Sequence, residues 1–278
     1  MQKLILFLSL ILVISSCKKE TIKNYDSENE TEIQKYLETN NLQAEKTESG
    51  LYYIINKQGD GLQPKRDGDV IISYKATYTN DKLIEESDEY GYAYNLQRVI
   101  AGWSEGVPLL NEGGEIKLII PSRLAFGNIK NGNIPAGSVL VFDIKLIATK
   151  EGIDDVNKKQ IDNYLKDNNL TAQKSSSGLY YIIEEEGTGS RPNINSNITL
   201  KYNGQFLNGK TFDDNKGKEA TFDLQGLIPG FQEGLLLFKE GGKGKLLIPS
   251  KLGYGFGGRG SISPGAVLVF DIELTKVN

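Results

Sequence analysis

Residues 240–255 read EGGKGKLLIPSKLGYG and residues 112–127 read EGGEIKLIIPSRLAFG, so one stretch occurs twice without a gap. The repeat extends in both directions: IQKYLETNNLQAEKTESGLYYII at 33–55 matches IDNYLKDNNLTAQKSSSGLYYII at 161–183, and NIPAGSVLVFDIKL at 133–146 matches SISPGAVLVFDIEL at 261–274. The offset is 128 residues throughout. This period is the length of a whole domain, since solenoid units repeat every ~20–50 residues. We therefore predict two copies of one domain, at 32–149 and 160–278, joined by a linker at 150–159.

Composition places both copies among ordinary soluble globular domains. The chain has 278 residues, of which 38% are hydrophobic and 24% charged, enough for two cores of typical size. Its net charge is −4 with both signs interspersed, which does not suit a nucleic-acid-binding surface. It has no histidine and one cysteine, so the usual general base and the usual zinc and iron–sulfur ligands are missing. We expect no metal, no cofactor and no nucleic-acid partner.

The single cysteine closes an apolar N-terminal run. Lys3 precedes an apolar stretch at 4–14, which is shorter than the ~20 residues that a membrane-spanning helix needs. The stretch ISSC at 14–17 resembles a bacterial lipobox, in which the cysteine is lipidated. We predict a lipoprotein signal peptide at 1–17, lipidation of Cys17 and a flexible tether at 18–31, with the protein anchored in the cell envelope at the periplasmic face or outer membrane. A plain signal peptide or a buried strand is the alternative.

Hydrophobic periodicity predicts a mixed fold. Ile33, Tyr36 and Leu37 recur at helical spacing, as do their counterparts 128 residues later, and an Asn-Asn pair ends each predicted helix. Strands are predicted at 51–56, 70–79, 115–120 and 138–147 and at the matching positions of the second copy, and 228–235 favours one or two helical turns. Asn208-Gly209 is a strong hairpin signal. The predicted class is α+β, with an antiparallel sheet and little helix.

A series of motifs in the second copy resembles a known enzyme family. The motifs are YNG at 202–204, GKTFD at 209–213, FDL at 222–224, IPGF at 228–231, IPS at 248–250, GYG at 253–255 and ISPGAVLVFDIEL at 262–274. Their order is similar to that of FKBP-type peptidyl-prolyl cis/trans isomerases, and the resemblance covers about the last 80 residues of each copy. It implies a sheet of five or so strands wrapped around one short helix, with an aromatic pocket between them. It also implies proline-containing polypeptides as partners.

The reaction of that family suits a chain without histidine. Rotation about an X–Pro bond crosses a barrier of roughly 18–20 kcal/mol because amide resonance is lost in the twisted state. No covalent bond is made or broken, so no nucleophile, metal or cofactor is required. An apolar cup that holds the proline ring and excludes water can favour the twisted amide.

The resemblance implies a complete site in the second copy. Asp213 and the Tyr254 hydroxyl are the implied polar contacts, and Ile228 is implied to offer its backbone N–H to the substrate. The alternative is that the aromatic residues fill a β core and that Asp213 is a turn residue. The implied site consists of Tyr202, Phe212, Asp213, Phe222, Leu227, Ile228, Phe231, Tyr254, Ile262 and Phe270.

The first copy departs from this pattern at polar and aromatic positions. Ile84 replaces Phe212, Glu85 replaces Asp213, and Phe126 replaces Tyr254, which removes a hydroxyl. We therefore expect the first domain to be weakened or inactive, and to act as a spacer or peptide-binding module. Its corresponding positions are Tyr74, Ile84, Glu85, Tyr94, Val99, Ile100, Trp103, Phe126, Ile134 and Phe142.

Two functions follow from this reading. The first is a lipid-anchored prolyl isomerase that assists the folding of exported proteins, with activity mainly in the second domain. The second is a non-catalytic peptide-binding chaperone or assembly module of an envelope complex. Turnover of an X-Pro peptide separates the two, because binding alone does not accelerate isomerisation.

Overall fold

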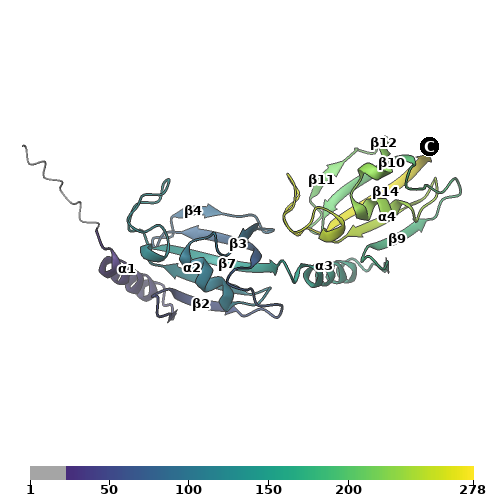
Figure 1. The fold of residues 1–278 in the computed structure, drawn as a ribbon. Coiled ribbons are helices and arrows are strands. Elements are labelled where there is room, and N and C mark those ends of the chain that lie inside the picture. Colours follow the sequence, from purple (N-terminus) through teal and green to yellow (C-terminus); the bar gives the residue numbers. More distant parts are fainter. Residues whose placement is uncertain (1–22) are drawn as a thin grey trace, which may run out of the picture.

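The computed structural model describes residues 23–278, which form two domains that follow one another along the chain (Figure 1). The predicted signal peptide, Cys17 and the start of the predicted tether lie outside the described residues. Within residues 23–278, no helix combines the length and the apolar character needed to cross a bilayer.

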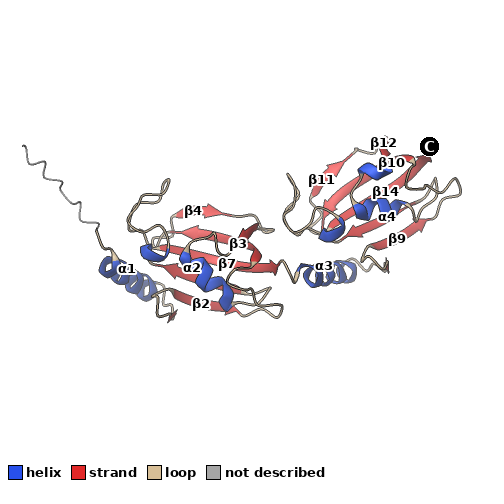
Figure 2. Cartoon of the chain, viewed as in Figure 1, coloured by secondary structure: helices blue, strands red, loops and turns tan. Residues whose placement is uncertain are grey.

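Each domain is built on one antiparallel sheet, drawn in red in Figure 2. In the first domain the strand order is β1-β2-β6-β7-β3-β4, and β5 also pairs with β3. The strands are β1 (Glu45–Lys46), β2 (Tyr52–Lys57), β3 (Asp69–Thr77), β4 (Leu83–Glu86), β5 (Tyr92–Asn95), β6 (Glu115–Ile120) and β7 (Leu140–Thr149). The sheet has seven strands rather than about five, since β1 adds a two-residue edge and two short strands, β4 and β5, pair with β3 in succession.

The second domain repeats this topology. Its strand order is β11-β10-β14-β13-β9-β8, and β12 also pairs with β10. The strands are β8 (Gln173–Lys174), β9 (Tyr180–Glu185), β10 (Asn197–Phe206), β11 (Thr211–Asp214), β12 (Ala220–Asp223), β13 (Lys243–Ile248) and β14 (Leu268–Val277). Asn208 and Gly209 lie in the β10–β11 hairpin, as predicted, and Gly209 has a φ of +82°. These elements confirm the predicted α+β class.

A short helix crosses the core face of each sheet: α2 (Ala101–Gly106) in the first domain and α4 (Pro229–Leu235) in the second. Pro229 occupies the first helical position, where its missing N–H is not needed. Gly230 and Gly234 allow α4 to lie directly on β13. A Cβ atom on Gly230 would come within 2.4 Å of Ile248 Cγ2, and one on Gly234 within 2.5 Å of Leu246 Cδ1. Each domain also has two 3-10 helices: η1 (Val107–Leu109) and η2 (Ser122–Leu124) in the first, and η3 (Leu224–Gly226) and η4 (Ser250–Leu252) in the second.

A longer helix packs on the opposite face of each sheet. In the first domain this is α1 (Asp26–Thr39), which buries Ile33, Tyr36 and Leu37 against β2, β6 and β7. In the second domain it is α3 (Ile153–Asp167), which buries Ile161 in the same way. Both helices end directly before an Asn-Asn pair, as predicted. Asn41 and Asn169 adopt left-handed φ values of 51° and 54°, which stop the helix.

Both helices begin earlier than predicted, and this changes two proposed boundaries. Residues 26–31 of the predicted tether belong to α1, and residues 153–159 of the predicted linker belong to α3. The first turn of α1 is polar and carries no apolar periodicity, whereas α3 begins with Ile153 and has Val156 three positions later. Acidic side chains at Asp26 and Glu28, and at Asp154 and Asp155, suit the positive end of a helix dipole.

A loop of the first domain contacts the second domain. The rings of Tyr90 and Phe206 lie 5.1 Å apart, and Asn208 Nδ2 donates to Glu89 Oε1 at 2.6 Å. Tyr90 packs against the hydrophobic cluster of the second domain.

A buried carboxylate holds the chain just before α3. Glu112 accepts hydrogen bonds from the backbone N–H and the hydroxyl of Thr149, each at 2.7 Å.

Candidate functional site

A cavity of about 170 Å³ lies between α4 and the sheet of the second domain. The residues come from strands β10, β11, β12 and β14, from the η3–α4 segment and from the loop after β13. The side chains are mostly apolar, with one carboxylate, one guanidinium and two phenolic hydroxyls. The lining residues are Tyr202, Asp213, Phe222, Gly226, Leu227, Ile228, Phe231, Tyr254, Arg259 and Phe270.

Eight of the ten residues that the resemblance implied line this cavity. The other two, Phe212 and Ile262, do not. Ile262 is buried in the core, and the Phe212 ring packs behind the cavity at 5.0 Å from Phe206 and 5.4 Å from Phe270. Arg259 lines the cavity but was not predicted. It lies in a glycine-rich loop, and no periodicity there distinguishes an inward residue from an outward one.

Edge-to-face aromatic contacts fix the walls of the cavity. The Phe231 ring lies 4.7 Å from that of Phe270 at an interplanar angle of 82°, and 6.5 Å from that of Tyr202 at 80°. The Tyr202 and Phe222 rings lie 5.9 Å apart at 65°. Such geometries add to the energy of simple burial and hold each ring in one orientation. The result is a preformed apolar cup with Phe231 at its base.

Tyr202 and Asp213 form the polar side of the cup. The Tyr202 hydroxyl donates to Asp213 Oδ2 at 3.1 Å. Burial, and then the nearby Asp213 charge, raises the pKa of Tyr202 to about 12, so the phenol is neutral at physiological pH. Asn215 holds the backbone of this strand: its Oδ1 accepts from the Tyr202 N–H at 3.0 Å and its Nδ2 donates to the Leu200 carbonyl at 2.9 Å.

The segment before α4 is held by a single glutamine. Gln232 Nε2 donates to the Leu227 carbonyl at 2.7 Å and to the Gln225 carbonyl at 3.0 Å. Ile228 caps the helix in an extended conformation, and its carbonyl accepts from the Phe231 N–H at 2.9 Å. Leu227 and Ile228 are therefore fixed at the edge of the cavity.

In the first domain, the equivalent rings close around Trp103. Its centroid lies 5.0 Å from Tyr74, 5.3 Å from Tyr94 and 5.2 Å from Phe142. The Tyr74–Trp103 distance of 5.0 Å compares with 6.5 Å for Tyr202–Phe231, so the larger indole fills space that is open in the second domain. Trp103 is 4% exposed, and within the described part of the chain its indole N–H is buried without a hydrogen-bond partner. The remaining apolar positions, Ile84, Val99, Ile100, Phe126 and Ile134, pack partly buried around this cluster.

The polar contact also differs between the domains. Tyr94 occupies the position of Phe222. Its hydroxyl donates to the Tyr74 hydroxyl, with 3.5 Å between the two oxygens. Burial raises the pKa of Tyr74, as it does for Tyr202. Glu85, at the Asp213 position, is exposed.

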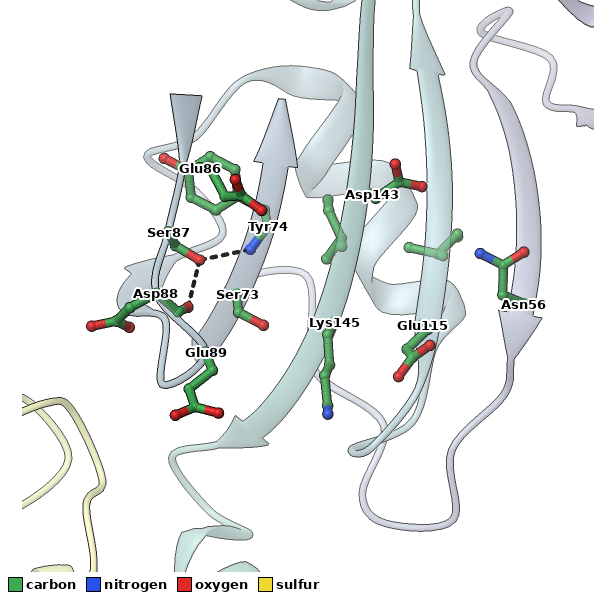
Figure 3. Close-up of a pocket in the computed structure, with 12 residues that line it drawn as sticks. Asn56, Ser73, Tyr74, Glu86, Ser87, Asp88, Glu89, Glu115, Asp143 and Lys145 are labelled. Atoms are coloured by element: carbon green, nitrogen blue, oxygen red, sulfur yellow. Dashed lines mark hydrogen bonds between the residues drawn. The ribbon is translucent and has the colours of Figure 1, made fainter. Parts of the chain in front are cut away.

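A larger hollow of about 420 Å³ lies on the other face of the first sheet (Figure 3). Ser87, the counterpart of Asn215, accepts from the Tyr74 N–H and donates to the Asp88 carbonyl, both at 2.9 Å. Tyr74 is the only aromatic residue among the twelve that line it, and most of the others are charged or polar. Across residues 23–278, no group of three or more potential metal-ligand side chains comes together. The aromatic cavity of the second domain is therefore the better candidate site.

The sheet wrapped around a short helix, with an aromatic cavity between them, is the architecture that the resemblance implied. A family model described as FKBP-type peptidyl-prolyl cis-trans isomerase matches residues 61–147 and 189–275. The two matches together cover more than half of the chain, and the protein belongs to this family. Both matched segments lie inside the predicted domains.

Individual relatives match about half of this chain or less. FkpA of Aeromonas hydrophila, an FKBP-type peptidyl-prolyl cis-trans isomerase, is 39% identical over 137 residues, which are 48% of this chain and 50% of the relative. FkpA of Escherichia coli K12 is 44% identical over 105 residues, 37% of this chain and 39% of the relative. The crystal structure of Escherichia coli FkpA aligns with 37% identity and a TM-score of 0.42, covering 46% of this chain and 62% of that one. The chain thus spans half or less of the length of these two curated relatives.

Proposed function

We propose that this protein is a peptidyl-prolyl cis/trans isomerase that acts on X-Pro bonds of exported proteins, mainly through its second domain. The observation that carries the proposal is the preformed aromatic cavity of about 170 Å³, in which eight residues of the family pattern meet. Its volume is close to that of an engineered apolar cavity of ~150 Å³ that binds benzene, so it suits one small ring.

The cavity can favour the twisted amide in two ways. Phe231, Phe222 and Phe270 surround the proline ring and keep water from its amide, so the planar form loses the solvation that stabilises its polar carbonyl. The Tyr254 hydroxyl and the Ile228 N–H, both at the cavity, are donors for the carbonyls of the bound peptide. The Asp213 carboxylate holds the Tyr202 hydroxyl and so keeps this ring in place.

We assign the first domain a weakened or absent activity. Trp103 fills the centre of its aromatic cluster, and the hydroxyl of Tyr254 has no equivalent at Phe126. The domain then serves as a spacer or as a peptide-binding module. The second candidate function is that the whole chain holds peptides as a chaperone or assembly module without turning them over.

We further propose that Cys17 carries a lipid that anchors the protein in the cell envelope. The support is the sequence alone, namely the apolar run at 4–14 followed by ISSC at 14–17.

The test is isomerisation of a short X-Pro peptide by the full chain and by two matched variants. Phe231→Ala and Trp103→Ala truncate the equivalent ring in the second and first domains. We expect Phe231→Ala to abolish most of kcat/KM and Trp103→Ala to leave it nearly unchanged, with circular dichroism checking that both variants fold. Equal losses would contradict the assignment to the second domain, and an inactive wild-type chain that binds the peptide would favour the chaperone.

A further inference from the structure

The N-terminal end of the long helix, including the residue before α1, contacts the same loop in both domains. The helices α1 and α3 lie at corresponding edges of their domains (Figure 1). Three residues make the contacts: Tyr25, Asp26 and Asn29 in the first domain and Ile153, Asp154 and Asn157 in the second. All six lie outside the segments that match the family model, 61–147 and 189–275. The contacts thus join residues outside the matched segments to a loop inside them.

Asn157 is at the centre of this contact. Its side chain is fully buried, with 0% exposure. Its Oδ1 accepts from the Ser250 N–H at 2.7 Å, and its Nδ2 donates to the Gly265 carbonyl at 2.9 Å. Asn29, which is 2% exposed, repeats both bonds with Ser122 and Gly137 at 2.8 and 2.7 Å. An asparagine side chain carries both an acceptor oxygen and a donor NH₂ group, so a single residue can make both bonds.

The two bonds hold the ends of a loop that carries part of the cavity. Residues 250–265 include Tyr254 and Arg259, which line the cavity, and Ile262, which lies behind it. Inside the loop, the Gly255 N–H donates to the Ser250 carbonyl at 2.8 Å and the Gly265 N–H donates to the Gly255 carbonyl at 3.1 Å. The residue next to Tyr254 is therefore bonded to both of the positions that Asn157 holds.

Two neighbouring residues of α3 also contact the 250–265 loop. Ile153 packs against Gly265, where a Cβ atom would come within 2.8 Å of Ile153 Cδ1. Asp154 pairs with Lys251 at 2.9 Å, and Asp26 pairs with Arg123 at 3.1 Å in the first domain. Both ion pairs are exposed and contribute little by themselves. The buried amide is the stronger element, because its loss leaves a buried N–H and a buried carbonyl without partners.

We propose that Asn157 is a positioning residue for the cavity: through Ser250 and Gly265 it sets the loop that carries Tyr254, so that the first turn of α3 is part of the functional site. The inference rests on the proposed isomerase function. It predicts that a change in a helix outside the cavity alters turnover, and that the same change in α1 does not.

The experiment compares Asn157→Ala with Asn29→Ala in the full chain. The two variants remove the same bonds, so a purely structural role predicts similar losses of melting temperature and no loss of activity while the protein stays folded. We expect Asn157→Ala to lower kcat/KM roughly five- to a hundredfold, mainly through kcat, because a displaced catalytic group misses the transition state. We expect Asn29→Ala to change it less than about twofold, within the range of distant, independent sites.

A double-mutant cycle with Tyr254→Phe tests the route of the effect. If Asn157 acts through the Tyr254 hydroxyl, Asn157→Ala should cost less in the Tyr254→Phe background than in the wild type. Equal fold-losses in both backgrounds, or wild-type kcat/KM in folded Asn157→Ala, would overturn the proposal. An inactive wild type would instead refute the proposed function.

A conservative variant covers the case in which Asn157→Ala does not fold. Asn157→Asp keeps the acceptor for the Ser250 N–H and removes the donor to the Gly265 carbonyl. Amide exchange should then stay slow at Ser250 and become faster around Gly255, together with a lower kcat. If Asn157→Asp also fails to fold while Asn29→Ala folds, Asn157 is a folding residue, and the positioning role is rejected.

Discussion

The hydroxyl of Tyr202 donates a hydrogen bond to the carboxylate of Asp213, with 3.1 Å between the two oxygens. The pair joins β10 to β11 at the polar side of the cavity. It keeps the Tyr202 ring in place, and it disfavours ionisation of the phenol because a second negative charge would lie beside the first. Glu85 and Tyr74 occupy the same positions in the first domain, where Tyr94 supplies the hydroxyl contact instead.

Alkaline unfolding should report the Tyr202 environment. The pKa of Tyr202 rises from 10.0 to about 12, so above pH 10 the unfolded chain releases a proton that the folded chain retains. Stability is therefore fully present below pH 10 and falls between pH 10 and 12. We expect Tyr202→Phe to lose less stability than the wild type over this window, measured by urea unfolding at several pH values. Parallel curves for the two proteins would contradict the assignment.

Gly204 should tolerate a side chain only if Phe212 becomes smaller. A Cβ atom on Gly204 would lie 2.7 Å from Phe270 Cε1 and 2.9 Å from Phe212 Cζ, whereas the first domain combines Ala76 with Ile84. We expect Gly204→Ala to lower the free energy of unfolding by about 1–3 kcal/mol through overpacking. Phe212→Ile should recover part of this loss, with a coupling of about 0.5–3 kcal/mol in a double-mutant cycle. Simple additivity would show that the two positions do not compensate each other.

Removal of the Tyr254 hydroxyl should lower turnover without unfolding the domain. Tyr254→Phe copies the first domain, which has Phe126 at this position. If the hydroxyl bonds a substrate carbonyl, the loss is about 0.5–1.5 kcal/mol of transition-state stabilisation, or a factor of roughly 2 to 13 in kcat/KM. Phe231→Ala should lower kcat/KM further. An unchanged rate in Tyr254→Phe would mean that Phe126 does not explain a weaker first domain.

Trp103 should be insensitive to ligands of the second domain. It is the only tryptophan, it is 4% exposed, and it lies in the core of the first domain. We expect weak quenching by acrylamide and no change in emission when a proline peptide saturates the second cavity. The matched reporter is the double variant Trp103→Phe, Phe231→Trp, whose emission should respond to the same peptide. A saturable change in the wild type would instead show that the first cluster opens to admit a peptide.

Cys17 should be the membrane attachment point. It is the only cysteine of the chain, so it has no partner for an intramolecular disulfide. We expect Cys17→Ser to block processing or to move the protein from the membrane fraction to the soluble fraction. Fractionation followed by immunoblotting measures both outcomes. Processed protein that stays on the membrane with a serine at this position would point to another anchor.

The repeat, the strands and the cores of the helices could be predicted because they depend on contiguous residues. The hydrophobic pattern of residues 115–120 predicts a strand, and the structure has β6 there. The helical spacing of Ile33, Tyr36 and Leu37 predicts the buried side of α1. The first turn of α1 could not be predicted, since residues 26–30 are all polar and have no apolar stripe. The first turn of α3 does carry Ile153 and Val156 at helical spacing, but the predicted linker at 150–159 does not use it. Docking on a loop stabilises the start of α1, which has no apolar pattern of its own.

The family, the α+β class and the aromatic character of the site follow from residue types in a fixed order, and so could be predicted from the sequence. Which side chains reach the cavity depends on the tertiary structure. Phe212 and Ile262 lie behind it and Arg259 lines it, because loop and strand-end orientations depend on packing between distant segments. The tertiary structure also decided that the amide of Asn157 is buried. Its two partners lie 93 and 108 residues further along the chain, and only folding brings such groups within hydrogen-bond distance.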